Sequence, residues 1–309
     1  MKIIKFSISS DFGMFKQGNN WMHDKDINKD TSGKFIFNSY IFPHFPFILG
    51  LLGAAYGFKG YSEYQSLTKT IEKINNENYL NKFQKEKEQS KSKVNEKKIK
   101  ELNIKIEKYN FFINEIFEKI NNFELDFFNY FKNKLYIGVE IHNIPIISNY
   151  YLTNTKKDGI VSKKGNTYVW LNDVIENPSY SFYFYGEDYF IDEIQSKLEN
   201  PYYTLKMGKN RFIINDFNVQ KIEDFNLIND NEFFINSNIL IKEKDIIEDN
   251  TFVNINDFIP FSYDKINHNN FDKCCVSFDK DDKIKIQLKD ESICVNMANK
   301  NVVLYKVKG

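Results

Sequence analysis

The amino-acid sequence predicts an α+β protein, and three observations carry this prediction. Apolar and polar residues alternate over Lys2–Ser9 and again over Leu135–Ile141, which is the pattern of half-buried strands. An apolar helix with three glycines is expected at Phe47–Gly57, and a heptad pattern fills Ile99–Tyr130. If Phe212–Val219 forms a last strand, the elements follow the order β-α-β-β-α-β, with one long helical insertion.

Length, composition and cysteine spacing narrow the class of protein. A chain of 309 residues, 42% of them hydrophobic, can form one large domain or two modest ones. The formal net charge of zero argues against a protein that coats nucleic acid with its whole surface, but it allows a local basic groove. The three cysteines, which lack the spacing of a zinc site, are expected to be free thiols in a reducing cytosol: Cys274, Cys275 and Cys294.

Nothing in the sequence predicts a metal, a cofactor or a membrane segment. The first apolar run is short and ends at Asp11, unlike a signal peptide. The apolar run Phe45–Phe58 is shorter than the roughly 20 residues that span a bilayer. We therefore expect a soluble cytoplasmic protein.

The first loop and the first helix combine polar donors, aromatic rings and glycines. In the loop Asp11–Lys34, Lys16 and Gln17 place donors beside the ring of Phe15, although a solvated loop is the alternative. The helix that follows carries Gly50, Gly53 and Gly57 at i, i+3 and i+7, on one face. This stripe predicts a close backbone approach to a sheet or to a ligand, with plain helix packing as the alternative.

The segment from residue 62 to residue 133 is predicted to be an inserted helical hairpin with its tip near residues 88 to 96. Its middle, Asn81–Lys108, contains ten lysines and five glutamates, which a solvated helix face also explains. We expect the base of the hairpin to dock on the sheet or on a partner. The heptad seam consists of Ile99, Leu102, Ile106, Tyr109, Ile113, Ile116, Ile120, Phe123, Phe127 and Tyr130.

The second half of the chain is predicted to be mostly strand. Ile146–Leu152 and Tyr168–Trp170 flank a polar turn with Lys163 and Lys164, which predicts a flexible polar β-hairpin. A strand over Ser179–Gly186 and a helix over Ile191–Leu198 follow. Residues 222–309 are expected to form a β-rich region packed on the main sheet, with strands at Asn238–Asp245, Cys274–Phe278, Lys283–Lys289 and Val302–Val307 and a hairpin turn at Asp279–Asp282.

Two places offer chemistry. His44, near Tyr40, is the candidate for acid–base chemistry, although a packed or ligand-contacting histidine explains it as well. Lys206–Arg211 contains three cations and no acid, and Gly208 allows a close backbone approach, which suits a phosphate; a tight turn with an ion pair at Arg211 is the alternative. Stacking on single-stranded bases could involve Phe15, Tyr40 or Trp170.

Several short motifs, taken in order, resemble the Cas five family, the CRISPR-associated subunit of Cascade-type surveillance complexes. They are an F-G-x-F loop at Phe12–Phe15, an S-Y-x-x-P-x-x-P segment at Ser39–Pro46, a G-L-L-G-A-x-x-G helix at Gly50–Gly57, a P-x-Y strand start at Pro178–Tyr180, and a P-x-x-x-L-x-x-G-K-x-x-F segment at Pro201–Phe212. The set covers about two thirds of the chain, and the inserted hairpin is not part of the family pattern.

The resemblance implies a ferredoxin-like (RRM-like) domain at residues 1–61 and 134–221, with a β-hairpin thumb, the insertion at residues 62–133 and a C-terminal region at residues 222–309. It implies a non-catalytic antiviral subunit that binds the 5′ handle of the guide RNA (crRNA) and links a Cas seven-type backbone subunit to the large subunit, with target DNA nearby. A metal-independent precursor-RNA endonuclease and an adaptor without RNA contact are the alternatives. The implied RNA-binding residues are Phe15, Lys16, Gln17, Ser39, Tyr40, His44, Gly50, Lys163, Lys164, Trp170, Gly208, Lys209, Asn210 and Arg211.

Overall fold

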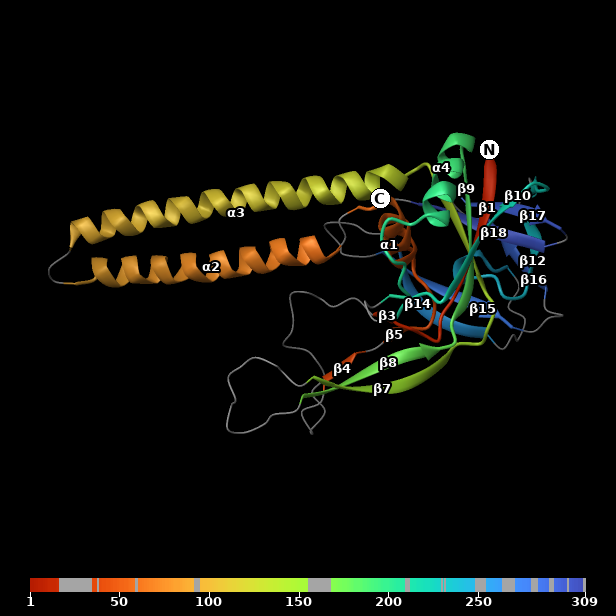
Figure 1. The fold of residues 1–309 in the computed structure, drawn as a ribbon, viewed down its shortest axis with the longest axis horizontal. Helices are drawn as coiled ribbons and strands as arrows, with labels where there is room; N and C mark the ends of the chain where they lie inside the picture. Colours follow the sequence, from red (N-terminus) through yellow and green to blue (C-terminus); the bar gives the residue numbers. More distant parts are fainter. Residues whose placement is uncertain are drawn as a thin grey trace. The chain divides into compact units, whose positions relative to one another are not determined.

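The computed structural model of the chain describes residues 1–16, 35–37, 39–58, 61–91, 95–154, 168–208, 212–228, 230, 232–247, 254–262, 270–278, 283–288, 292–298 and 300–307. The chain forms two compact units (Figure 1). Residues 1–57 and 131–309 make up the first unit, and residues 58–130 make up the second.

The first unit is built on one antiparallel sheet of seven strands in the order β10-β1-β9-β6-β18-β17-β11. The first strand of the chain therefore lies between two strands from its second half. The chain is α+β, as the sequence predicts. The strands are β1 (Lys2–Ser9), β6 (Tyr136–Ile141), β9 (Ser179–Gly186), β10 (Asp216–Ile222), β11 (Asn226–Ile228), β17 (Ser292–Met297) and β18 (Lys300–Lys306).

The C-terminal strands extend this sheet, whereas the sequence analysis expected a region packed on it. β18 pairs with β6 through Tyr305 and Ile137. Further along β6, the amide of Ile141 donates to the carbonyl of Asn238 at 2.8 Å. Two C-terminal segments thus share the edge of β6, and this pairing satisfies backbone groups that would otherwise form an open edge.

Two helices, α1 (Phe45–Tyr56) and α4 (Asp188–Glu199), cover one face of the sheet (Figure 1). The side chains of Phe6 and Phe182 on that face are 0% exposed. The ring of Phe47 from α1 lies 6.4 Å from the ring of Phe182, centroid to centroid. Burying each such side chain stabilises the fold by about 1.5–3 kcal/mol, so this layer is the main core of the unit.

The glycines of α1 have different roles. Gly57 ends the helix with a φ of 80°, a left-handed conformation that glycine adopts without strain. A Cβ there would also lie 2.7 Å from Cγ of Tyr202. Gly53 is buried, but Gly50 is exposed, and a Cβ on Gly50 would have nothing within 4 Å. The expected approach to a sheet is therefore wrong for Gly50, and an approach to a ligand stays a prediction.

A projecting β-hairpin consists of β7 (Ile146–Asn154) and β8 (Tyr168–Glu176), which pair from Ile146 and Glu176 to Asn154 and Tyr168 (Figure 1). The opposite edge of β8 pairs with the short strands β2 (Phe12–Gly13) and β4 (Phe35–Phe37). The hairpin therefore shares strands with the first loop of the chain. The expected turn, with Lys163 and Lys164, lies outside the described residues.

Smaller sheets complete the C-terminal region. β12 (Glu232–Asn236) pairs with β16 (Lys283–Gln287), and β15 (Asn270–Ser277) lies between β13 (Ile241–Lys242) and β14 (Asn254–Ser262). The expected hairpin between β15 and β16 is wrong, because the two strands pair in different sheets. All three cysteines are buried free thiols.

The second unit is a pair of helices that run antiparallel, α2 (Tyr61–Gln89) and the part of α3 (Glu96–Phe131) up to Tyr130 (Figure 1). Polar contacts join them: Asn78 Nδ2 donates to Asn110 Oδ1 at 2.8 Å, and Tyr109 OH donates to Glu77 Oε2 at 2.9 Å. Leu102 is 4% exposed, but Ile99, Ile106, Tyr109, Ile113 and Ile116 of the expected seam are only half-buried. Within the described residues, no helix is long and apolar enough to cross a membrane.

Candidate functional site

Three segments that are far apart in the sequence meet at the start of α1. The short strands β3 (Phe15–Lys16) and β5 (Ser39–Tyr40) pair with each other, with Phe15 opposite Tyr40. The amide of Phe15 donates to Ser39 Oγ at 2.9 Å, and the Ser39 hydroxyl donates to the carbonyl of Tyr40 at 2.9 Å. The structure therefore brings together five of the predicted site residues, which are Phe15, Lys16 (by its backbone), Ser39, Tyr40 and His44.

The aromatic rings of this cluster pack on one another. The ring centroid of Phe15 lies 4.6 Å from that of Phe47, and the centroid of Tyr40 lies 5.2 Å from that of His44. Phe15 is 1% exposed and Tyr40 is 6% exposed. Neither ring presents an open face to a base in this conformation, so these residues build the site and do not line its surface.

His44 has a structural task at the N-terminus of α1. Its Nδ1 accepts a hydrogen bond from the amide of Phe47 at 3.0 Å, which satisfies one of the free N–H groups of the first turn. Burial of the ring lowers the pKa of His44 to about 3. The neutral ring therefore carries its proton on Nε2, and its one basic lone pair is committed to the helix cap.

Gly208 holds a third segment against this cluster. The amide of Met14 donates to the carbonyl of Met207 at 3.1 Å, and the amide of Met207 donates to the carbonyl of Phe212 at 2.7 Å. Gly208 has a φ of 89°, and a Cβ there would lie 1.8 Å from the carbonyl oxygen of Met14. The close approach that the sequence predicts at Gly208 is thus an approach to protein backbone. The same contacts hold the backbone of Met207 against Met14 on one side and against Phe212 on the other.

Several predicted site residues cannot be placed by their side chains. Lys209, Asn210 and Arg211 lie outside the described residues, as do Gln17, Lys163 and Lys164. The backbones of Lys16 and Trp170 belong to β3 and β8, and the backbone of Trp170 lies opposite those of Leu152 and Phe35.

Two exposed aromatic residues that the sequence patterns did not single out precede residues 209–211 in the chain. Tyr202 is 72% exposed and Tyr203 is 41% exposed, and their ring centroids lie 4.8 Å apart. Their amides donate to the carbonyls of Ala55 and Ala54 at the end of α1, at 3.0 and 3.1 Å, which fixes their backbone. The signal was a Pro-Tyr-Tyr sequence just before the basic segment. These rings, and not those of Phe15 and Tyr40, offer surface for stacking.

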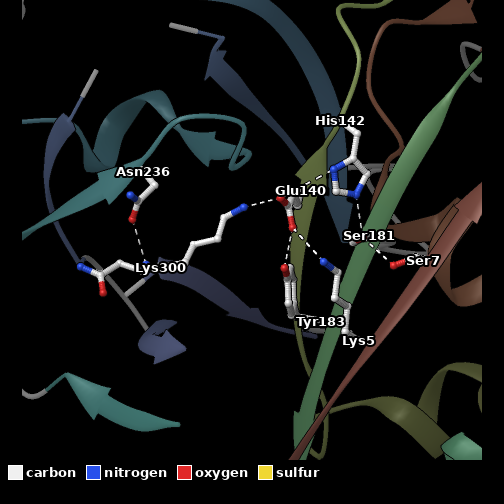
Figure 2. A network of polar contacts seen from close by, with 9 residues as sticks. Lys5, Ser7, Glu140, His142, Ser181, Tyr183, Asn236 and Lys300 are labelled. Carbon is white, nitrogen blue, oxygen red and sulfur yellow. Dashed lines mark hydrogen bonds and ion pairs between the residues drawn. The ribbon is translucent and has the colours of Figure 1, made fainter. Parts of the chain in front are cut away.

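A second polar cluster, also missed, lies on the face of the sheet opposite the aromatic core. Glu140 of β6 is 5% exposed and contacts Lys300 of β18, Tyr183 of β9 and Lys5 of β1 (Figure 2). Burial by itself would raise the pKa of the Glu140 carboxyl, but the hydrogen bonds from Lys300 and Tyr183 outweigh it and hold the pKa below its ordinary value. Glu140 therefore stays ionised and ties the C-terminal strand to the first strands.

The same cluster contains a carboxylate, an imidazole and a hydroxyl in a row. His142 Nδ1 lies 3.7 Å from Glu140 Oε1, and His142 Nε2 lies 2.7 Å from Ser181 Oγ (Figure 2). Ser181 is 0% exposed, and its Oγ also lies 2.8 Å from Ser7 Oγ. A nucleophile must reach its substrate, so this row does not form a hydrolytic site and instead orders the polar face of the sheet. Within the described residues, no group of three His, Cys, Asp or Glu side chains could hold a metal ion.

Seventeen chains of solved structures are similar to this chain, and two of them illustrate the similarity. No protein-family model and no curated protein matches the chain. A chain of a structure described as "CRISPR RNA-guided surveillance complex" is 10% identical, with a TM-score of 0.42, over 93% of this chain and 91% of that chain. A structure described as "Crystal structure of Cas protein" is 10% identical, with a TM-score of 0.34, over 90% of this chain and 95% of that chain. Neither similarity is close enough to carry a functional argument.

Proposed function

We propose that this chain is a non-catalytic subunit of a CRISPR surveillance complex that binds the 5′ handle of the guide RNA. The observation that carries the proposal is the convergence of Phe12–Phe15, Ser39–His44 and Met207–Gly208, three segments that hold the motifs resembling the Cas five family. Met207–Gly208 directly precedes Lys209 and Arg211 in the sequence, and these two cations are suited to phosphate.

The strand order supports the same proposal. The strands β10-β1-β9-β6, with α1 after β1 and α4 after β9, follow the order of an antiparallel β-α-β-β-α-β unit. This order supports the ferredoxin-like arrangement that the resemblance implies, and three C-terminal strands extend the same sheet. In this proposal the β7–β8 hairpin is the thumb, which contacts RNA and a Cas seven-type backbone subunit, and another surface meets the large subunit with target DNA nearby.

In this proposal the basic loop binds the backbone of the handle and the exposed tyrosines stack on its bases. Arg211 presents a planar fork that suits a phosphate or a base, and Lys209 adds a second cation. Stacking on Tyr202 or Tyr203 would contribute about 1–3 kcal/mol per base.

The binding proposal is tested with the handle RNA across a salt series. Arg211→Ala is expected to weaken binding and to flatten the slope of log affinity against log salt by about 0.7, the value for one phosphate contact on a single strand. Arg211→Lys separates charge from geometry, and Lys2→Ala, which removes a cation of the ion pair with Asp192, is the matched control. If Arg211→Ala leaves affinity and slope unchanged, the basic loop does not bind RNA, and the adaptor function is favoured.

We further propose that the chain does not cleave RNA, because the basic lone pair of His44 is committed to the cap of α1. Incubation with a repeat-containing RNA without divalent metal should leave the RNA intact. Cleavage at one position, lost in His44→Asn, would contradict this, since asparagine keeps the cap while removing the imidazole.

A further inference from the structure

The helix α3 has a second ordered face, which points away from α2. Residues 97, 100, 104, 107, 108, 111, 115 and 118 form one stripe along the helix, because each lies three or four positions from another member of the set. The side chains that contact α2, such as Leu102 and Tyr109, lie between them in the sequence. All eight residues of the stripe are exposed, and Ile104 and Phe111 are 65% and 61% exposed. We call this stripe the outer face of α3.

The charges on the outer face are separated by sign. Lys97 and Lys100 lie toward the N-terminal end, and Glu115 and Glu118 lie toward the C-terminal end. Ile104 and the ring of Phe111 lie between the two charged ends. Within the described part of the chain, none of these four charged side chains makes an ion pair, although neighbours such as Lys91 and Lys98 do. These four charged side chains therefore do not contribute ion pairs to the described part of the hairpin.

Read from either end, the outer face is complementary to itself. When a second α3 helix is laid antiparallel about a two-fold axis between Glu107 and Lys108, Lys97 lies opposite Glu118 of the second copy, and Lys100 lies opposite Glu115. In the same register Ile104 lies opposite Phe111, and Glu107 lies opposite Lys108. The full set of pairs that this register makes is 97 with 118, 100 with 115, 104 with 111 and 107 with 108, each formed twice.

We propose that the outer face of α3 binds the outer face of α3 in a second copy of this chain, antiparallel, as a two-fold symmetric dimer. Such an interface uses the same patch on both subunits, which requires this kind of self-complementarity. A parallel pair would place lysine against lysine and glutamate against glutamate, which disfavours that arrangement. The pairs of Ile104 with Phe111 supply burial, and the charged pairs set orientation and register.

The test is a charge reversal and its rescue, measured on the full chain by sedimentation velocity over a range of concentrations. Variant one carries Lys97→Glu and Lys100→Glu, and variant two carries Glu115→Lys and Glu118→Lys. Each should weaken self-association about tenfold or more, because four attractive pairs per dimer become repulsive. An equimolar mixture should recover association, since the acidic stripe of variant one matches the basic stripe of variant two.

Controls keep the result specific to this face. Lys82→Glu with Lys105→Glu makes the same change in charge on exposed residues outside the stripe and should leave association unchanged. Ile104→Ser with Phe111→Ser should abolish association, with the helical circular dichroism retained. A wild-type chain that stays monomeric up to its solubility limit would overturn the proposal. So would association that ignores both reversals, or a mixture of the two variants that fails to associate.

Discussion

The two units of this chain use opposite ways of holding themselves together. The first unit buries large aromatic rings completely, as Phe6, Phe182 and Phe184 illustrate with exposures of 0 to 1%. The second unit joins its helices through a mixed seam, in which the buried side chain of Asn78 lies among half-buried isoleucines. The difference indicates that a layered sheet can support its own fold, whereas a two-helix pair relies on length, local contacts and further association.

The buried polar groups of the two units also differ in how completely they are hydrogen-bonded. Glu140 in the first unit has contacts with three side chains that donate to it or pair with it, Lys300, Tyr183 and Lys5. Asn78 in the second unit donates one bond to Asn110, and within the described residues its Oδ1 has no hydrogen-bond partner. A satisfied buried network rigidifies a fold, while a half-satisfied one costs stability.

The largest effect is expected from the core of the first unit. Phe182→Ala should lower the free energy of unfolding by about 3–5 kcal/mol, because it leaves a cavity in a layer that cannot collapse easily. Urea unfolding followed by near-ultraviolet circular dichroism measures this, since that signal reports packed rings. Phe83→Ala, at a site on α2 that is 55% exposed, is the control and should change the free energy by less than about 0.5 kcal/mol. If Phe182→Ala and Phe83→Ala lowered the free energy of unfolding equally, the first unit would not depend on its buried aromatic core in the way described.

A smaller loss is expected from Glu140→Gln, about 2 kcal/mol, because two lysines and a tyrosine lose a buried anion. The loss should also depend on pH. The folded-state pKa of Glu140 lies below its ordinary value, so its contribution is complete above the unfolded-state pKa of about 4.3 and disappears as the pH falls through the folded-state value.

Wild type and Glu140→Gln should therefore converge in stability as the pH drops below about 4. Asp192→Asn, which breaks the more exposed ion pair with Lys2, is the matched control and should cost less than about 1 kcal/mol. A difference between wild type and Glu140→Gln that is constant from neutral pH to pH 3 would contradict the role given to the carboxylate.

In the second unit, replacing a buried polar residue should raise the stability of the fold and not lower it. Asn78→Leu is expected to stabilise the hairpin by about 1 kcal/mol, because it replaces an incompletely bonded amide with an apolar side chain in the seam. Hydrogen exchange of the α2 and α3 amides should slow accordingly. Asn76→Leu, at an exposed position of α2, should change exchange little. Faster exchange in Asn78→Leu would show that the bond to Asn110 outweighs burial.

The smallest effect is expected from removing most of the hairpin. Replacement of residues 68–128 by a short Gly-Ser bridge should leave the first unit folded, with its melting temperature changed by only a few degrees, because its sheet and core lie outside this segment. Thermal melting followed at the near-ultraviolet signal tests this. An insoluble product, or loss of a cooperative transition, would show that the insertion is part of the core.

Local patterns predicted most elements, and long-range pairing explains what they missed. Alternation located β1 and β6, and aromatic residues on both faces located β9. The joining of β18 to β6 was missed, because the sequence of a strand does not specify the partner at its edge. Within the candidate site, the close approach at Gly208 was predicted from the glycine itself. The burial of Phe15 was missed, because it depends on Phe47 in a different element.

The place of β1 in the sheet has a consequence for the order of folding during synthesis. Ser9 pairs with Ser179 of β9 on one side and with Asp216 of β10 on the other. The strand β1 therefore has no partner in the sheet until the second half of the chain has been synthesised. At 5–20 residues per second, the ribosome needs roughly 9–34 seconds to reach β9 after β1 is made. The helices of the insertion can form during this interval, because their contacts are local. The apolar face of β1 stays exposed to solvent until β9 and β10 are available. The newborn chain is therefore most vulnerable to aggregation at its N-terminal strand, and chaperone capture should concentrate there.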